Sequence, residues 1–226
     1  MTSFMLKIIG IITMLSDHIG DSIIGHFSFF NYLGRISFPL FAFQITQGYQ
    51  YTKNLKKYIL KLLIWGCISQ IPFMLFLSTF QTGNDIYVLN IFFTFILGIF
   101  AILCYDKLNN KVLAILLVIF ISFIGHILQV DYGAFGILLI FCFYLFQNKK
   151  AYLCLSTIIL SIMQYIPKII DTPQFISHYA LCAFFTCLSL IFICTYKNEE
   201  GPKVKYLFYL FYPLHMFVLY LLHLAL

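Results

Sequence analysis

The chain has 226 residues, of which 62% are hydrophobic and 10% are charged, and its mean hydropathy is +0.95. Soluble domains carry about 25% charged residues, so this composition excludes an ordinary soluble enzyme and indicates a polytopic membrane protein. The formal net charge of +6 is interpreted as a topology signal, and no nucleic-acid partner is expected. The seven Cys are scattered singly and no His or Cys has a zinc-ligand spacing, so no metal site is expected.

Apolar runs of about 20 residues predict membrane-spanning helices along the whole chain. The connections are short, so the helices are expected to pack as antiparallel neighbours. The expected fold class is therefore all-α, a polytopic transmembrane helix bundle with about nine spans (8–10) in a single integral membrane domain, residues 1–226. In chain order the expected spans are 4–24, 33–50, 58–79, 86–105, 112–129, 133–147, 151–167, 176–196 and 205–225.

Lys and Arg orient this bundle, because cytoplasmic loops carry an excess of positive charge. With the N-terminus in the cytoplasm, twelve of the fourteen Lys and Arg residues fall on the inner side. The two exceptions are Arg35 and Lys168. The predicted environment is a lipid bilayer that the chain crosses several times, with lipid as the first partner. The twelve inner residues are Lys7, Lys53, Lys56, Lys57, Lys61, Lys107, Lys111, Lys149, Lys150, Lys197, Lys203 and Lys205.

The first span contains three ionisable side chains within five residues, in the stretch ITMLSDHIGDSIIG (11–24). At about 100° per residue, Asp17, His18 and Asp21 share one arc of the helix. Ionisable groups inside a membrane cost a few kcal/mol, so they face a bundle interior or a wet cavity. We expect a functional site here; the alternative is two interfacial acids beside a structural histidine.

The second span begins with Arg35 at its outer end, followed by a polar stripe. Gln44, Gln47, Gly48 and Tyr51 recur at helical spacing on one face. The guanidinium of Arg35 is suited to hold a carboxylate, Asp17 or Asp21, or a substrate oxyanion. A snorkelling Arg at the lipid headgroups is the alternative interpretation.

Two later spans each contain a polar residue and a proline near the middle. Gln70 and Pro72 interrupt the third span, and Pro213 and His215 interrupt the last. Proline frees a backbone carbonyl, which is tolerated where a polar neighbour satisfies it. Further polar residues fall at predicted outer ends, where they are candidates to line an external mouth: His26, His126, Asp131, Tyr132 and His178.

On these residues the chain resembles the TraX family over essentially its whole length. The more specific elements are D-H-x-G at 17–20 and G-R-x-x-F-P-x-F at 34–41, followed by KLLIWGCISQIPF, DYGAFGILLIFCFYLF and YLFYLFYPLH. The resemblance implies a multi-pass protein of the bacterial inner membrane, of the type known for N-acetylating pilin. It also implies a relation to multi-span acyltransferases that use cytoplasmic acetyl-CoA. The matching positions are Asp17, His18, Gly34, Arg35, Pro39, Gln70, Pro72 and His215.

The function expected from this resemblance is transfer of acetyl from acetyl-CoA to an amine or hydroxyl of a peptide or envelope acceptor. His18 is the expected general base, because imidazole titrates near neutral pH. Asp21, and less directly Asp17, would orient it, and Arg35 would bind the oxyanion or acceptor. The expected substrate-binding residues are Gln44, Gln47, Gln70 and His215, and the expected contacts to coenzyme A phosphates are Lys53, Lys56 and Lys57.

Two other functions stay open at this point. Buried Asp and His residues also build proton relays, so a transporter or proton-coupled permease is one alternative. Such a protein is expected to show matching broken helices in two halves, and the sequence shows none. The other alternative is a non-enzymatic membrane partner of an exported peptide.

Overall fold

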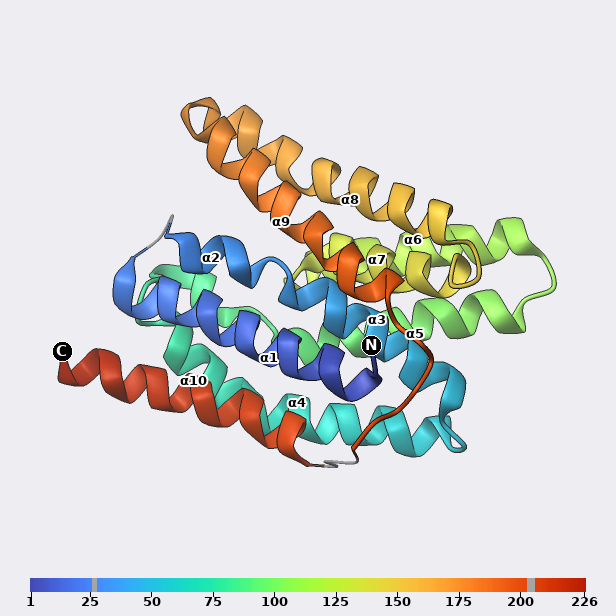
Figure 1. The fold of residues 1–226 in the computed structure, drawn as a ribbon, viewed down its shortest axis with the longest axis horizontal. Helices are drawn as coiled ribbons and strands as arrows, with labels where there is room; N and C mark the ends of the chain where they lie inside the picture. Colours follow the sequence, from blue (N-terminus) through green and yellow to red (C-terminus); the bar gives the residue numbers. More distant parts are fainter. Residues whose placement is uncertain (26–27, 203–205) are drawn as a thin grey trace.

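The computed structural model describes residues 1–25, 28–202 and 206–226, and this part of the chain is almost entirely helical (Figure 1). His26, Lys203 and Lys205 lie outside the described residues. In the described part an isolated bridge between Leu89 and Val130 is the single β-type pairing. The α-helices are α1 (Ser3–Ile19), α2 (Phe29–Gly34), α3 (Ser37–Tyr51), α4 (Leu55–Leu77), α5 (Ile91–Lys107), α6 (Lys111–Ile127), α7 (Gly133–Leu145), α8 (Lys150–Asp171), α9 (Ile176–Cys194) and α10 (Leu207–Ala225). Shorter turns are η1 (Gly20–Ile24), η2 (Gly83–Tyr87) and η3 (Pro173–Phe175).

The all-α fold class is confirmed, and a helix occupies each of the nine predicted segments. Five helical segments are long and apolar enough to cross a membrane: Ser3–Ile24, Leu55–Leu77, Lys150–Asp171, Pro173–Cys194 and Leu207–Ala225. The other helices of the described chain are shorter. The count of nine spans and the cytoplasmic N-terminus therefore stay predictions.

The segment expected as one span at 33–50 is divided in two. The short helix α2 ends at Gly34, and α3 begins at Ser37. Pro39 lies in the first turn of α3, where its missing N–H costs no helical hydrogen bond. Arg35 consequently stands at the turn between two helices.

The helices lie roughly along the long axis of the molecule (Figure 1). Helix α1 packs against α2, α3 and α10, and α10 runs beside α4. Helices α5, α6 and α7 form a second packed group, joined to the first through α3 and through the packing of α4 on α5. The α8–α9 hairpin packs on α7 and α3 and diverges from the rest toward one end (Figure 1).

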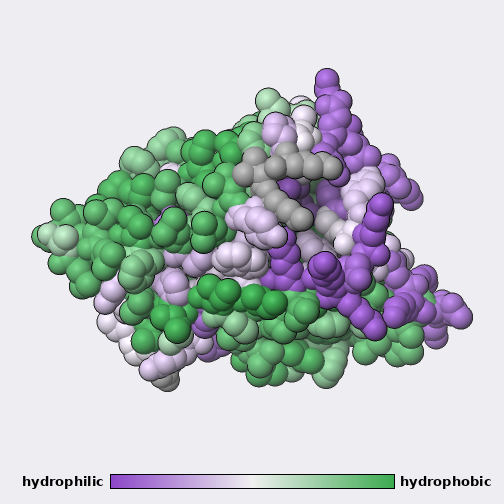
Figure 2. All heavy atoms as spheres, turned by 90° about the horizontal axis from the view of Figure 1, so that it is seen from below, coloured by the Kyte–Doolittle hydropathy of each residue, from purple (hydrophilic) through white to green (hydrophobic). Residues whose placement is uncertain are grey.

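Hydrophilic side chains gather at one end of the bundle, and apolar side chains cover most of the remaining surface in view (Figure 2). The hydrophilic end carries the connections α3–α4, α5–α6, α7–α8 and α9–α10. Their exposed cations are Lys53, Lys56, Lys57, Lys107, Lys111, Lys149, Lys150 and Lys197. We call this the Lys-rich end.

Two connections fold back into the bundle. Leu89 pairs with the backbone at 129–131: its N–H donates to the Gln129 carbonyl oxygen, and its own carbonyl oxygen accepts from Asp131. Tyr132, at a positive φ of 61°, then stacks on Phe38 with ring centroids 3.8 Å apart. Non-helical backbone is tolerated among apolar helices here because its polar groups form hydrogen bonds within the protein.

Gln70 and Asn90 hold the first of these connections in place. Asn90 is fully buried, caps α5 by accepting from the Phe92 N–H, and donates to the Gly66 carbonyl oxygen at 2.7 Å. The Gln70 side chain accepts from Asn90 and donates to the Val88 carbonyl oxygen. The mid-span polar group at Gln70 is therefore used to bind the chain's own backbone.

We expect Asn90→Ala to lower the free energy of unfolding by about 2 kcal/mol or more, because it leaves several buried polar groups without partners. Asn110 offers a matched control, since it caps α6 from an exposed position. Loss of an exposed cap costs about 1 kcal/mol. Thermal or denaturant unfolding of both variants in detergent measures the difference, and equal losses would contradict the buried role of Asn90.

Candidate functional site

A cavity of about 660 Å³ enters the bundle from the Lys-rich end, between α1, α3, α4, α5 and α10. Exposed residues such as Tyr51 and Glu200 form its rim. Its inner end is formed by buried side chains, namely Met14, Phe92 and Tyr212. The cavity thus runs from a charged surface to an apolar interior, and we call it the pocket.

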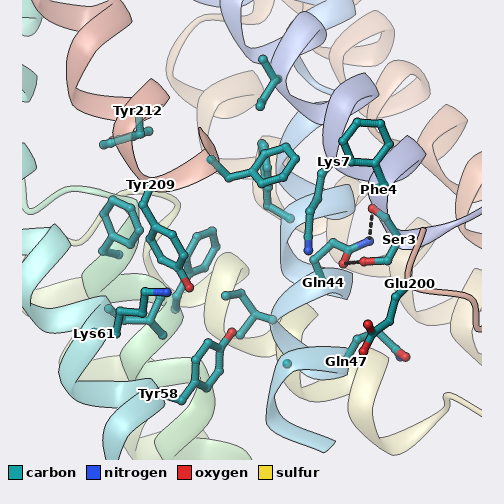
Figure 3. Close-up of a pocket in the computed structure, with 18 of the residues that line it drawn as sticks. Ser3, Phe4, Lys7, Gln44, Gln47, Tyr58, Lys61, Glu200, Tyr209 and Tyr212 are labelled. Atoms are coloured by element: carbon teal, nitrogen blue, oxygen red, sulfur yellow. Dashed lines mark hydrogen bonds between the residues drawn. The ribbon is translucent and has the colours of Figure 1, made fainter. Parts of the chain in front are cut away.

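Two lysines project into the pocket from different helices, Lys7 from α1 and Lys61 from α4 (Figure 3). The Lys61 ammonium lies 4.3 Å from the centroid of the Tyr209 ring. The Lys7 ammonium lies 5.4 Å from the centroid of the Phe208 ring. Both cations therefore sit over aromatic faces, an arrangement that stabilises them in a partly desolvated place.

Gln44 and Gln47 both line the pocket from α3, in agreement with their predicted positions on one face of this helix. The Ser3 hydroxyl donates to Gln44 Oε1 at 2.7 Å, and Gln44 Nε2 donates to the Ser3 carbonyl oxygen at 3.3 Å (Figure 3). These bonds join α3 to the start of α1. A substrate-binding role for the two glutamines stays a prediction.

The other residues predicted to bind substrate or coenzyme A do not line the pocket. Lys53, Lys56 and Lys57 are exposed at the Lys-rich end, beside the start of α4. Lys61, one turn further along α4 than Lys57, lines it instead. The spacing of Tyr58 and Lys61, three residues apart, is the sequence signal that points to this face of α4.

His18 and His215 form a direct pair just beyond the inner end of the pocket. His18 Nδ1 lies 2.8 Å from His215 Nε2, and the two rings are stacked. Met14, one turn before His18, lines the pocket. Tyr212, which also lines it, has its ring centroid 5.9 Å from that of His215. Sequence reasoning singled out both histidines but not their contact.

The backbone fixes the protonation pattern of this pair. His215 Nδ1 lies 2.7 Å from the Phe211 carbonyl oxygen, which can only accept, so this nitrogen carries a proton. In a neutral His215 the other nitrogen, Nε2, then accepts a hydrogen bond from His18 Nδ1. The Nε2 of a neutral His18 is left with its lone pair unshared, and no hydrogen-bond partner for it occurs among the described residues.

The predicted orienting acids are directed elsewhere. Asp17 accepts from Arg35 Nη2 at 2.9 Å, and the pair is largely buried, with 9% and 25% of the two side chains exposed. Gly34 permits the close approach of α2 to α1, since a Cβ there would lie 2.2 Å from Asp17 Cβ. Asp21 accepts from Asn31 Nδ2 at 2.7 Å. The residue that contacts the His18 imidazole within hydrogen-bonding distance is His215.

Arg35 is the centre of a polar cluster that lies apart from the pocket lining. Its electrostatic neighbours besides Asp17 include Tyr132, Tyr165 and Cys182, contributed by the α6–α7 connection, α8 and α9. Asp131, in the same connection, is close enough to interact electrostatically with both Asp17 and Arg35. Burial raises the pKa of Asp131 to about 7, and Asp17 adds to this effect while Arg35 opposes it.

Three of the candidates for an external mouth lie near this cluster. Asp131 and Tyr132 are two, and His178 is the third, with its Nδ1 3.0 Å from the Tyr32 hydroxyl. His126 borders a separate shallow surface depression on α6 and α7. No group of three or more His, Cys, Asp or Glu in the described chain has the geometry of a metal site.

We expect Asp17→Asn and Arg35→Gln each to destabilise the protein by about 3–5 kcal/mol, because each leaves a partner charge buried. The double variant should lose less than the sum of the two, by about 1–3 kcal/mol. Unfolding in detergent measures this cycle. Strictly additive losses would show that the ion pair does not couple the two positions.

Two comparisons with known proteins found matches that cover nearly the full chain. The family model described as TraX protein matches residues 3–223. The "Probable fimbrial assembly protein FimC, serogroup H1" of Dichelobacter nodosus is 27% identical over 243 residues, which cover 96% of this chain and 94% of that protein. No solved structure matches. Since the family model spans nearly every residue, the chain belongs to the TraX protein family.

Proposed function

We propose that this protein is a membrane-embedded acyltransferase that moves an acetyl group from acetyl-CoA to an amine or hydroxyl of a peptide or envelope acceptor. The observation that carries the proposal is the pocket that leads from the Lys-rich end to Tyr212, whose ring contacts His215 of the His18–His215 pair. A donor entering from a charged surface would thereby bring its reactive end next to a base.

The pocket has the chemistry that coenzyme A needs. Lys7 and Lys61 offer cations for phosphate oxygens, and the tyrosines around Lys61 offer faces for a purine ring. Further in, the apolar walls suit the uncharged arm that carries the thioester. Placing the Lys-rich end in the cytoplasm, as the distribution of Lys predicts, gives the pocket access to cytoplasmic acetyl-CoA.

In the reaction, the acceptor nitrogen or oxygen attacks the thioester carbonyl carbon, and the proton it loses passes to His18 Nε2. The carbon–sulfur bond then breaks, and the departing thiolate of coenzyme A takes up the proton. His215 acts as a positioning residue, because its fixed Nδ1–H holds the His18 ring in the tautomer that has a free Nε2. In this proposal His215 takes the orienting role first expected of Asp21.

Arg35 and its cluster are proposed to bind the acceptor or to keep α1 in place beside it. The ion pair with Asp17 anchors α1 one residue before His18. Geometric precision of this kind matters because a base must lie within hydrogen-bonding reach of the proton it removes.

A non-enzymatic role in the assembly of an exported peptide is the second candidate. The observation that favours it is the name of the Dichelobacter nodosus relative, a probable fimbrial assembly protein. Purified protein incubated with labelled acetyl-CoA and a membrane extract separates the two candidates. Label transferred to a peptide or envelope component supports the enzyme, and binding of a peptide without transfer supports the assembly role.

We expect His18→Ala to lower acetyl transfer by about 10²–10⁴-fold, the usual contribution of a general base. Part of the loss should be recovered at high pH, where the acceptor amine deprotonates without help. His215→Ala should cost less, because it removes orientation and leaves the base. Initial rates at several pH values measure both effects.

His223→Ala is the matched control, since this histidine is exposed near the end of α10 and bonds to the Ser22 carbonyl oxygen. It should keep the wild-type rate. Membrane abundance and thermal unfolding of each variant report whether it is folded. Near-normal turnover of well-folded His18→Ala would end the proposed mechanism.

A further inference from the structure

The inner end of the pocket contains a buried hydroxyl group whose proton has no acceptor. Tyr212 is 5% exposed and lines the pocket, and its hydroxyl finds no acceptor for its own proton among the described residues. Leaving a buried hydroxyl unsatisfied costs about 1–3 kcal/mol, so such groups are rare, and one that lines a pocket is a candidate to bond a ligand. The Tyr212 ring has a firm position, because it packs edge-on against Phe92 with centroids 5.2 Å apart.

The N-terminus of α5 meets the same place. Ile91 and Phe92, the first two residues of this 17-residue helix, line the pocket. The Phe92 N–H is capped by Asn90, and the Ile91 N–H is directed at the Tyr212 hydroxyl oxygen. The positive end of a helix dipole favours a negative charge near these first N–H groups.

The surroundings strengthen the hydrogen bond that Tyr212 can donate. Phe92, Phe95 and Met14 form apolar walls, each less than one-tenth exposed. Hydrogen bonds to a charged oxygen are stronger in such a poorly polarisable site than in water. The His215 ring lies 5.9 Å from the Tyr212 ring between centroids, so the ring that carries the hydroxyl borders the histidine pair.

We propose that the Tyr212 hydroxyl, which accepts from the Ile91 N–H at the start of α5, donates its proton to the acyl carbonyl oxygen of the donor and stabilises the oxyanion that forms on it. This inference rests on the proposed acyltransferase function and names a catalytic residue for it. When the acceptor attacks, the carbonyl π electrons move to oxygen, and Tyr212 donates its hydrogen bond to that oxygen. When the carbon–sulfur bond breaks, the electrons return and the thiolate leaves.

Tyr212→Phe removes one oxygen atom and keeps the ring, so it tests this role directly. The maximal rate of acetyl transfer should fall about 10²–10³-fold, as it does when one oxyanion donor is removed from other enzymes. The thermal midpoint of unfolding should stay the same or rise, because the variant no longer buries a hydroxyl whose proton has no acceptor. A merely structural hydroxyl predicts no loss of rate.

Ser69→Ala is the matched control. Ser69 on α4 is fully buried, and its hydroxyl has no partner among the described residues, but it does not line the pocket. The control should show the same unchanged or raised midpoint with an unchanged rate. An equal loss of rate in both variants would overturn the assignment to Tyr212.

A binding measurement without an acceptor separates failure of this inference from failure of the proposed function. Acetyl-CoA has the carbonyl oxygen, and S-ethyl-CoA lacks it. The wild type should prefer acetyl-CoA, and Tyr212→Phe should reduce that preference about 2–10-fold, the value of one hydrogen bond. If the wild type transfers acetyl and Tyr212→Phe retains both the rate and the preference, the oxyanion role is wrong and the acyltransferase stands. If the wild type neither binds nor transfers, both are wrong.

Discussion

A polar group placed among apolar helices must find a partner within the protein, and much of this structure is arranged by that requirement. Asn90 and Gln70 satisfy the backbone of a connection that folds back toward the middle of α4. Asp17 and Arg35 satisfy each other across α1 and the α2–α3 turn. In both places a buried side chain has several bonds, because an unmade bond in such surroundings costs more than a made one contributes.

Because of the same requirement, the few buried polar atoms without a hydrogen bond of ordinary geometry need an explanation. Within the described residues, three buried side-chain atoms have none: Ser69 Oγ, Gln81 Oε1 and Tyr212 Oη. Of these residues, Tyr212 lines the pocket. Most of the interior is satisfied without a ligand, and the exception at Tyr212 coincides with the start of α5 and with the histidine pair.

Helix positions were predictable from the sequence because apolar runs and short polar connections are local features. The polar residues of the first span were also identifiable, since Asp17 and His18 stand out in an apolar run. Arg35 was expected to hold Asp17 or Asp21, and it holds Asp17. The partner of His18 was not predictable, because its contact to His215 joins residues 197 positions apart. Such pairing depends on which helices become neighbours, and one-dimensional periodicity does not contain that information.

The same limit explains why the lysines predicted to bind coenzyme A are not the ones that line the pocket. A cluster at 53–57 is a strong composition signal, but it reports the end of the bundle rather than the wall of a cavity. Lys7 and Lys61 line the pocket because α1 and α4 both border it, which is a property of helix packing. Tyr209 and Tyr212 on α10 lie three residues apart and share one face for the same reason, although nothing local distinguishes them from interfacial tyrosines.

The adjacency of Asp17 and His18 is the feature that joins the parts of the site. Neighbouring residues on a helix project about 100° apart, so the two side chains leave α1 in different directions. Asp17 faces α2 and the Arg35 cluster, and His18 faces α10 and the end of the pocket. A shift or rotation of α1 that broke the ion pair would therefore also displace the imidazole from His215. The largely buried ion pair, which fixes the rotation of α1, thus sets the geometry of the histidine pair without contacting a substrate bound in the pocket.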